Sequence, residues 1–169
     1  PQWSPDGRHI AFSGKDNKLW MARVNAGKAM TIAESDYLAN DTFRAVWSPC
    51  GRYLAYSLGL SNHNRRLMLY DVDGEQSHTI TTDGFADSPA FDRSGRYLYY
   101  IGSHNAALAA ANNIWGLLSA IQFGPLVTKT INAVILHDDQ PAPLLPVTGR
   151  PHPDAGFEEV DTRPIDFGE

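Results

Sequence analysis

The sequence predicts an all-β protein, a fragment of a β-propeller with about three four-stranded antiparallel blades. The first observation is a repeat: WSPCGRYLAYS at residues 47–57 recurs as WSPDGRHIAFS at 3–13 and FDRSGRYLYYIG at 91–102. The second is its spacing, since the opening aromatic stands at positions 3, 47 and 91, an interval of 44 residues. A period in the forties is typical of propeller blades. The third is that every copy places a turn between an aromatic residue and an apolar run, as in an antiparallel hairpin.

The turn chemistry of each copy supports this interpretation. Proline presets φ at the first central position of a turn, and glycine accepts the left-handed conformation that closes a bulged hairpin. We therefore expect structural turn roles for Ser4, Pro5, Asp6 and Gly7 in the first copy, Ser48, Pro49 and Gly51 in the second, and Asp92 and Gly95 in the third.

The repeats place the strands of each blade in order. We expect strands at residues 2–4, 9–13, 18–24 and 29–33, then at 44–48, 53–58, 66–72 and 78–82, and finally at 89–91, 97–101, 133–137 and 144–147. The third strand of each of the first two blades is apolar on both faces, as expected of a sheet packed between two others.

The same reading gives the domain boundaries. Blade 1 spans residues 1–43 with a truncated first strand, blade 2 spans 44–87, and blade 3 spans 88–147 with an insertion at 102–132. Alanines and leucines within that insertion favour a short helix. Residues 148–169 form a Pro-rich acidic linker and the start of a further strand.

Topology alone separates two faces. In a four-stranded meander, alternate connections emerge at the same end of the sheet, and here all the short turns fall at one end. The long connections between strands two and three, and between blades, emerge at the other end. Because binding residues concentrate on loops held by a rigid scaffold, we expect function on the loop-rich face.

Composition excludes several classes of function. The net charge of −5 comes without a basic stripe, so we expect no nucleic-acid partner. The single Cys50 gives neither a disulfide nor a metal pair, and DVDGE at residues 71–75 reads as a hairpin turn rather than a calcium loop. No apolar run reaches the ~18 residues of a membrane span. We expect no metal, no cofactor and no membrane contact.

The motifs resemble those of known propeller families. WSPDGR-x-IAF followed by a KLWM-type strand resembles the repeats of TolB-like proteins, the prolyl-oligopeptidase group and tricorn-type proteases. PAFDRSGRYLYYIGSHN at residues 89–105 and EEVDTRPIDFGE at 158–169 resemble the second propeller of tricorn-type serine peptidases. The sequence departs from that pattern in its Ala-rich insertion, and in RPIDFGE where IDFDG would be expected.

The resemblance implies a function in peptide hydrolysis other than catalysis. It implies a non-catalytic propeller of a tricorn-like serine peptidase that scaffolds or gates peptide access. Within the chain no G-x-S-x-G elbow occurs, so we expect no catalytic residue here. Two alternatives stay open: a TolB-like protein–protein interaction propeller, and the propeller of a prolyl-oligopeptidase-type hydrolase.

One cluster on the loop-rich face is a candidate substrate-binding site. Arg44, His63, Arg65 and Arg66 bring cationic and imidazole groups together, and arginine binds carboxylates through charge-assisted hydrogen bonds. They are a candidate site for a peptide carboxylate. The alternative interpretation is solvated loop charge, with Arg66 flanking a strand.

Three blades are fewer than the ~4–8 that close a propeller. We therefore expect the open faces of the terminal blades to pack against the remaining blades of a parent chain or against another copy of this chain. Separately, we expect a peptide or protein as the binding partner. The chain begins at Pro1 rather than Met, which we interpret as a fragment. Its compartment stays open between the cytoplasm and the periplasm or exterior.

Overall fold

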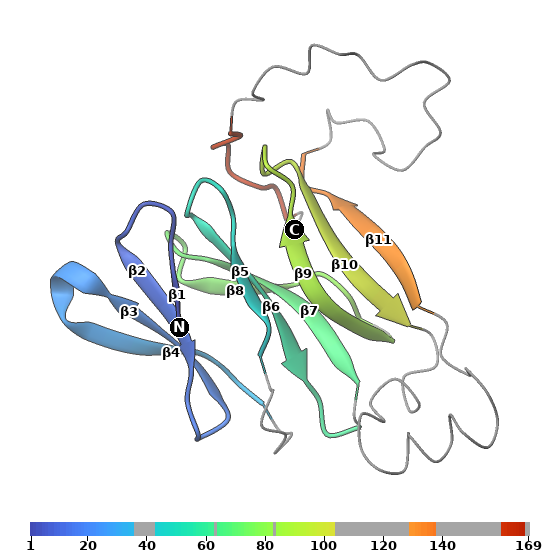
Figure 1. Ribbon diagram of the computed structural model, residues 1–169, viewed down its shortest axis with the longest axis horizontal. Helices are drawn as coiled ribbons and strands as arrows, with labels where there is room; N and C mark the ends of the chain where they lie inside the picture. The colour runs from blue at the N-terminus through green and yellow to red at the C-terminus, as the bar shows by residue number, and fades with distance from the viewer. Residues whose placement is uncertain (36–42, 63, 83, 104–128, 138–159, 168–169) are drawn as a thin grey trace.

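The computed structural model describes residues 1–35, 43–62, 64–82, 84–103, 129–137 and 160–167. Within these residues the chain forms strands and one 3-10 turn, η1 (Val24–Ala26). The fold is all-β, as predicted, and consists of antiparallel meanders placed side by side (Figure 1).

Blade 1 is a complete four-stranded meander. Its strands are β1 (Gln2–Trp3), β2 (His9–Ser13), β3 (Lys18–Arg23) and β4 (Lys28–Glu34), paired in the order β1-β2-β3-β4. All three pairings are antiparallel, so the predicted up-and-down topology is present.

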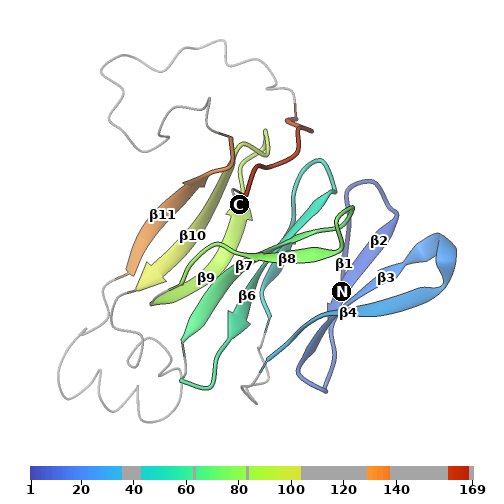
Figure 2. The same ribbon diagram turned by 180° about the vertical axis from the view of Figure 1, so that it is seen from behind.

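Blade 2 repeats this arrangement. Its strands are β5 (Ala45–Trp47), β6 (Tyr53–Gly59), β7 (Arg65–Asp71) and β8 (Gln76–Thr79), each pairing antiparallel with the next. Figure 2 shows β8 beside β7, and the strand order places it on the edge of β7 opposite β6. Strands β6 and β7 are almost wholly buried, as expected of a blade held between two neighbours.

Blade 3 contributes three strands to the described residues. They are β9 (Phe85–Phe91), β10 (Tyr97–Ser103) and β11 (Lys129–Ile135), and a single parallel bridge between Arg65 and Phe85 joins β9 to blade 2. The predicted fourth strand at 144–147 and the predicted helix lie outside the described residues.

Strand β11 begins earlier than the predicted strand at residues 133–137. Residues 129–132 belong to β11, where they pair in register with residues 100–103 of β10. We expected the strand to start at residue 133, but Lys129 and Thr130 extend it because β10 offers a backbone partner as far as Ser103.

The start of a further strand, predicted within residues 148–169, can be compared with the structure only at residues 160–167. This segment, called the tail below, is extended but pairs with no strand of the described residues. Its backbone N–H groups bond singly: Asp161 donates to the Ser94 carbonyl at 2.7 Å and Ile165 to the Tyr53 hydroxyl at 2.8 Å. Pro164, which has no N–H, lies between these two donors, so a regular ladder does not form.

The three repeat turns share one geometry. In the first two copies a serine hydroxyl accepts the backbone N–H that follows the turn, from His9 to Ser4 at 2.9 Å and from Tyr53 to Ser48 at 3.0 Å. In the third copy the Asp92 carboxylate does this for Tyr97 at 2.8 Å. The turn glycines Gly7, Gly51 and Gly95 all have positive φ, between 70° and 78°.

Two apolar clusters hold the blades together. The first joins blades 1 and 2 and contains Ala11, Leu19, Met21, Trp47, Leu54, Tyr56, Met68, Tyr70 and Val72. The second joins blades 2 and 3 and contains Tyr53, Ala55, Leu67, Leu69, Ala86, Leu98 and Leu136, with Ile165 and Phe167 of the tail packed against it. The core is therefore a pair of inter-blade seams.

Candidate functional site

The structure places the long connections of the described residues opposite the repeat turns. The repeat turns at residues 4–8, 48–52 and 92–96 gather along one edge, called the tight face (Figure 1). The ends of β4, β6 and β10 and the starts of β5, β7, β9 and β11 form the opposite edge, called the loop-rich face.

Two of the four predicted binding residues meet on the loop-rich face. Arg65 Nη1 lies 3.1 Å from Asp87 Oδ1, and Arg44 Nε lies 3.6 Å from Asp87 Oδ2. Arg44 Nη1 also donates to Ser88 Oγ at 2.9 Å. Arg44, Arg65 and Asp87 are called the arginine–aspartate cluster below.

The two arginines of the cluster differ in exposure. The side chain of Arg65 is 17% exposed and its guanidinium lies over the Phe85 ring, 5.8 Å from the centroid. The side chain of Arg44 is 46% exposed and faces solvent at the start of β5. Arg65 is thus the more buried arginine beside Asp87, and Arg44 is the more exposed one.

The other two predicted residues do not join the cluster. Arg66 follows Arg65 in β7 and therefore points to the opposite face of the strand. Its Nε is buried and has no hydrogen-bond partner among the described residues. His63 lies outside the described residues.

A small cavity lies near the cluster on the same face. It has a volume of about 150 Å³ and is lined by Gly84, Phe85, Ala86, Tyr100, Gly102, Ser103, Thr130 and Asn132. Phe85 belongs to this wall and also contacts Arg65, so the cavity and the arginine–aspartate cluster share a residue. Ser103 Oγ is buried there without a hydrogen-bond partner in the described structure.

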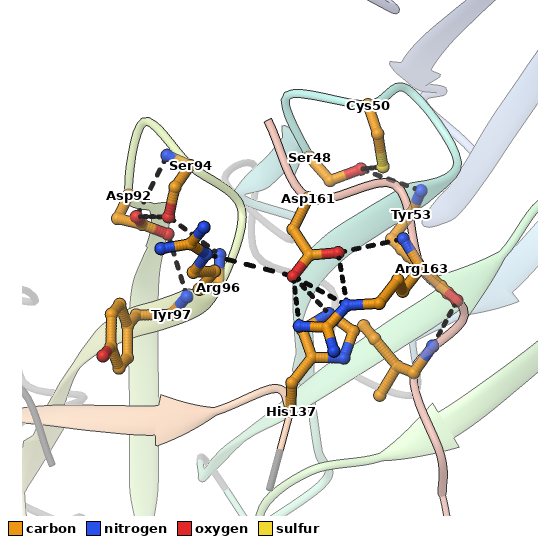
Figure 3. Close-up of polar contacts among 11 residues, drawn as sticks. Ser48, Cys50, Tyr53, Asp92, Ser94, Arg96, Tyr97, His137, Asp161 and Arg163 are labelled. Carbon is orange, nitrogen blue, oxygen red and sulfur yellow. Dashed lines mark hydrogen bonds and ion pairs between the residues drawn. The ribbon is translucent and has the colours of Figure 1, made fainter. Parts of the chain in front are cut away.

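A second charged cluster lies on the tight face, around Asp161 of the tail (Figure 3). Arg163 Nη2 lies 2.6 Å from Asp161 Oδ2, His137 Nε2 lies 3.7 Å from the same oxygen, and Arg96 Nε lies 3.9 Å from it. The Asp161 side chain is only 6% exposed. Sequence reasoning missed this cluster because no motif links Asp161 to residues so far back in the chain.

Acid should reduce the stability that the Asp161 cluster contributes. Hydrogen bonds from Arg163 hold the pKa of Asp161 well below its ordinary value of 3.8, against an opposing effect of burial. A lowered pKa gives stability that is present above the ordinary value and is lost as the pH falls below it. The difference between the urea midpoints of the wild type and Asp161→Asn should therefore narrow as the pH falls from about 4 to about 2. A gap that stays constant over this range would contradict the assignment.

Two further kinds of site were sought among the described residues. No group of three or more His, Cys, Asp and Glu side chains in these ranges is placed to hold a metal ion. Within the same residues no helix is long and apolar enough to cross a membrane. Ser4 and Ser48 both use their hydroxyls in turns, Ser48 lying 3.3 Å from the free Cys50 Sγ.

Comparison with known proteins defines the class. No family model matches the sequence. A tricorn protease homolog of Saccharolobus solfataricus is 29% identical over 102 residues, which is 60% of this chain and 9% of that protein. A tricorn-like protease C-terminal subunit of Sulfurisphaera tokodaii is also 29% identical, over 103 residues, 60% of this chain and 12% of that protein.

The fold agrees with that relationship. The crystal structure of the tricorn protease superposes with a TM-score of 0.61 and covers 89% of this chain and 15% of that one, at 16% identity. The chain is a β-propeller fragment. It is homologous over part of its length to tricorn protease homologues, whose namesake is a serine peptidase, and it spans about a tenth of the relatives it matches.

Proposed function

We propose that this chain is a non-catalytic β-propeller module of a tricorn-like serine peptidase, where it scaffolds or gates the access of peptide substrates. Homology to tricorn protease homologues is the observation that carries the proposal. We assign the chain to the second propeller of such an enzyme on the third repeat and the tail, the two segments that resemble it.

The arginine–aspartate cluster is the proposed peptide contact. Two guanidinium groups share the Asp87 carboxylate, one from the start of β7 and one from the residue before β5. Arg65 is the more buried partner of Asp87, and Asp87 in turn orients Arg44, the more exposed arginine, beside which we place a peptide carboxylate. Arg65 is thus a positioning residue and Arg44 the residue that contacts the ligand.

Kinetics of the complete peptidase that carries this segment test the proposal. Arg44→Gln should raise KM for an oligopeptide about threefold to tenfold and leave kcat unchanged, because one charge-assisted contact is lost equally from the ground and transition states. The matched control is Arg93→Gln, which removes an exposed arginine from a turn of the tight face. An unchanged KM in Arg44→Gln, or an equal change in both variants, would reject this role.

A further inference from the structure

Blades 2 and 3 differ at one equivalent position of their third strands. This position lies near the arginine that follows the turn glycine, Arg52 in blade 2 and Arg96 in blade 3. In blade 2, Tyr53 of β6 pairs with Asp71 of β7. Arg52 donates two hydrogen bonds to the Asp71 carboxylate, of 3.2 and 2.9 Å. In blade 3, Tyr97 of β10 pairs with Ile135 of β11. The third strand of blade 3 therefore offers no carboxylate to Arg96.

The tail supplies a carboxylate in its place, but the contact is loose. Asp161 approaches Arg96 Nε only to 3.9 Å, and this Nε is buried without a hydrogen bond in the described structure. The oxygens of Asp161 are taken by Arg163 of the tail itself, whose Nε lies 3.0 Å from Oδ1 and whose Nη2 lies 2.6 Å from Oδ2. Figure 3 shows the Asp161 carboxylate facing Arg96, Arg163 and His137. The bidentate pair that Arg52 forms with Asp71 in blade 2 therefore has no counterpart at Arg96 in blade 3.

The rest of the tail occupies a series of subsites along the seam between blades 2 and 3. The Asp161 N–H donates to the Ser94 carbonyl, and the Ile165 N–H donates to the Tyr53 hydroxyl. The Phe167 ring stacks on His78 with centroids 3.5 Å apart and planes 2° apart, and its edge approaches Tyr53. The seam thus binds a carboxylate, two N–H groups of an extended backbone, and an aromatic ring six residues after the carboxylate.

We propose that this seam is a docking site for an extended acidic peptide segment, which the tail occupies in cis through an imperfect contact with Arg96. The tail does not form a bidentate hydrogen-bonded pair with Arg96. An incoming segment can form that pair if its aspartate is not neutralised by an arginine of its own. The site lies on the tight face, so it is independent of the proposed peptide contact at Arg44.

Peptide binding to the full chain tests this site. The probe is a fluorescein-labelled peptide of residues 159–168 in which glutamine replaces Arg163, EVDTQPIDFG, so that its aspartate is not neutralised by its own arginine, and the readout is fluorescence anisotropy. Asp161→Asn in the protein loosens the tail and should bind the probe saturably, whereas the wild type should bind it about tenfold more weakly because its own tail competes. The matched control, Asp166→Asn, makes the same charge change at an exposed position of the tail and should behave as the wild type.

Two further arms assign the carboxylate subsite. A probe with asparagine in place of its first aspartate should bind Asp161→Asn about tenfold more weakly, a loss of about 1.4 kcal/mol. Arg96→Gln added to Asp161→Asn should give a similar loss with the original probe. Far-UV circular dichroism establishes that each variant is folded, and Phe167→Ala replaces Asp161→Asn as the tail-loosening variant if that protein unfolds. Absence of binding to the folded variant, or binding indifferent to Arg96, would overturn the proposal.

Discussion

Replacing Trp47 by alanine should lower the free energy of unfolding by about 3–5 kcal/mol, the range for removing a large buried aromatic side chain. Trp47 is 7% exposed and belongs to the cluster between blades 1 and 2. Its indole N–H donates to the Gln2 carbonyl of blade 1 at 3.2 Å, and its ring lies 6.1 Å from that of His9. The substitution therefore opens a cavity and leaves a part-buried carbonyl without its donor.

The chain supplies a matched control at the same position of the first repeat. Trp3 is 60% exposed, because the described residues place no blade before blade 1. Trp3→Ala should change the free energy of unfolding by about 0.5 kcal/mol, as for most surface substitutions. Urea unfolding followed by far-UV circular dichroism measures both variants without depending on tryptophan fluorescence. Equal losses would show that burial between blades is not what makes the repeat aromatic stabilising.

The second large effect is expected at Asp71, where Asp71→Ala should destabilise the protein by about 3 kcal/mol. Arg52 makes two hydrogen bonds to this carboxylate, whose side chain is 12% exposed, and the backbone N–H of Asp73 donates to it at 3.0 Å. Hydrogen bonds to a charged group each contribute roughly 1.5–3 kcal/mol. The substitution also leaves the part-buried Arg52 without its main partner.

Asp73 is the matched control for Asp71. It lies 3.4 Å from the Nε of the same Arg52, but its side chain is 71% exposed. Exposed ion pairs contribute about 0–1 kcal/mol, so Asp73→Ala should have little effect on the urea midpoint. If both variants lost the same stability, the two hydrogen bonds from Arg52 to Asp71 would not be the cause of the destabilisation in Asp71→Ala.

The effect at Asp71 should also depend on pH. Burial alone raises the pKa of this carboxyl, but the hydrogen bonds from Arg52 and from backbone N–H groups outweigh it, so the pKa is lowered below 3.8. The stabilisation is therefore complete above the ordinary pKa and declines below it. The difference between the wild type and Asp71→Ala should shrink as the pH falls below about 4.

The blades were predictable from sequence because their signals are local. A Ser-Pro-x-Gly turn fixes its own φ values and hydrogen bonds, so Ser48 and Gly51 could be placed without knowing the rest of the fold. Repetition at a fixed interval then gave the strand order. The start of β9 was less predictable, since Pro89 suggested a strand only from that residue onward. In the structure β9 runs from Phe85, and a register shift beside Ser88, which has a φ of 54°, accommodates the proline.

The charged sites were only partly predictable because their partners are distant in sequence. Arg44 and Arg65 could be proposed from their charge and their place on the loop-rich face. Nothing in the sequence indicated that Asp87 would lie between them, or that Arg65 would be the more buried of the two. The Asp161 cluster depends on how the tail crosses the seam between blades 2 and 3, which is a tertiary contact without a local pattern.

The central claim is that the loop-rich face of this propeller receives peptide. Photocrosslinking to the wild-type protein tests it most directly, with an oligopeptide that carries benzoylphenylalanine next to its C-terminal residue and with mass spectrometry to locate the adducts. The account predicts adducts at residues 43–45 and 84–88, which surround the arginine–aspartate cluster, and predicts that Arg44→Gln reduces them. Adducts confined to the turns at residues 4–8, 48–52 and 92–96 would contradict it.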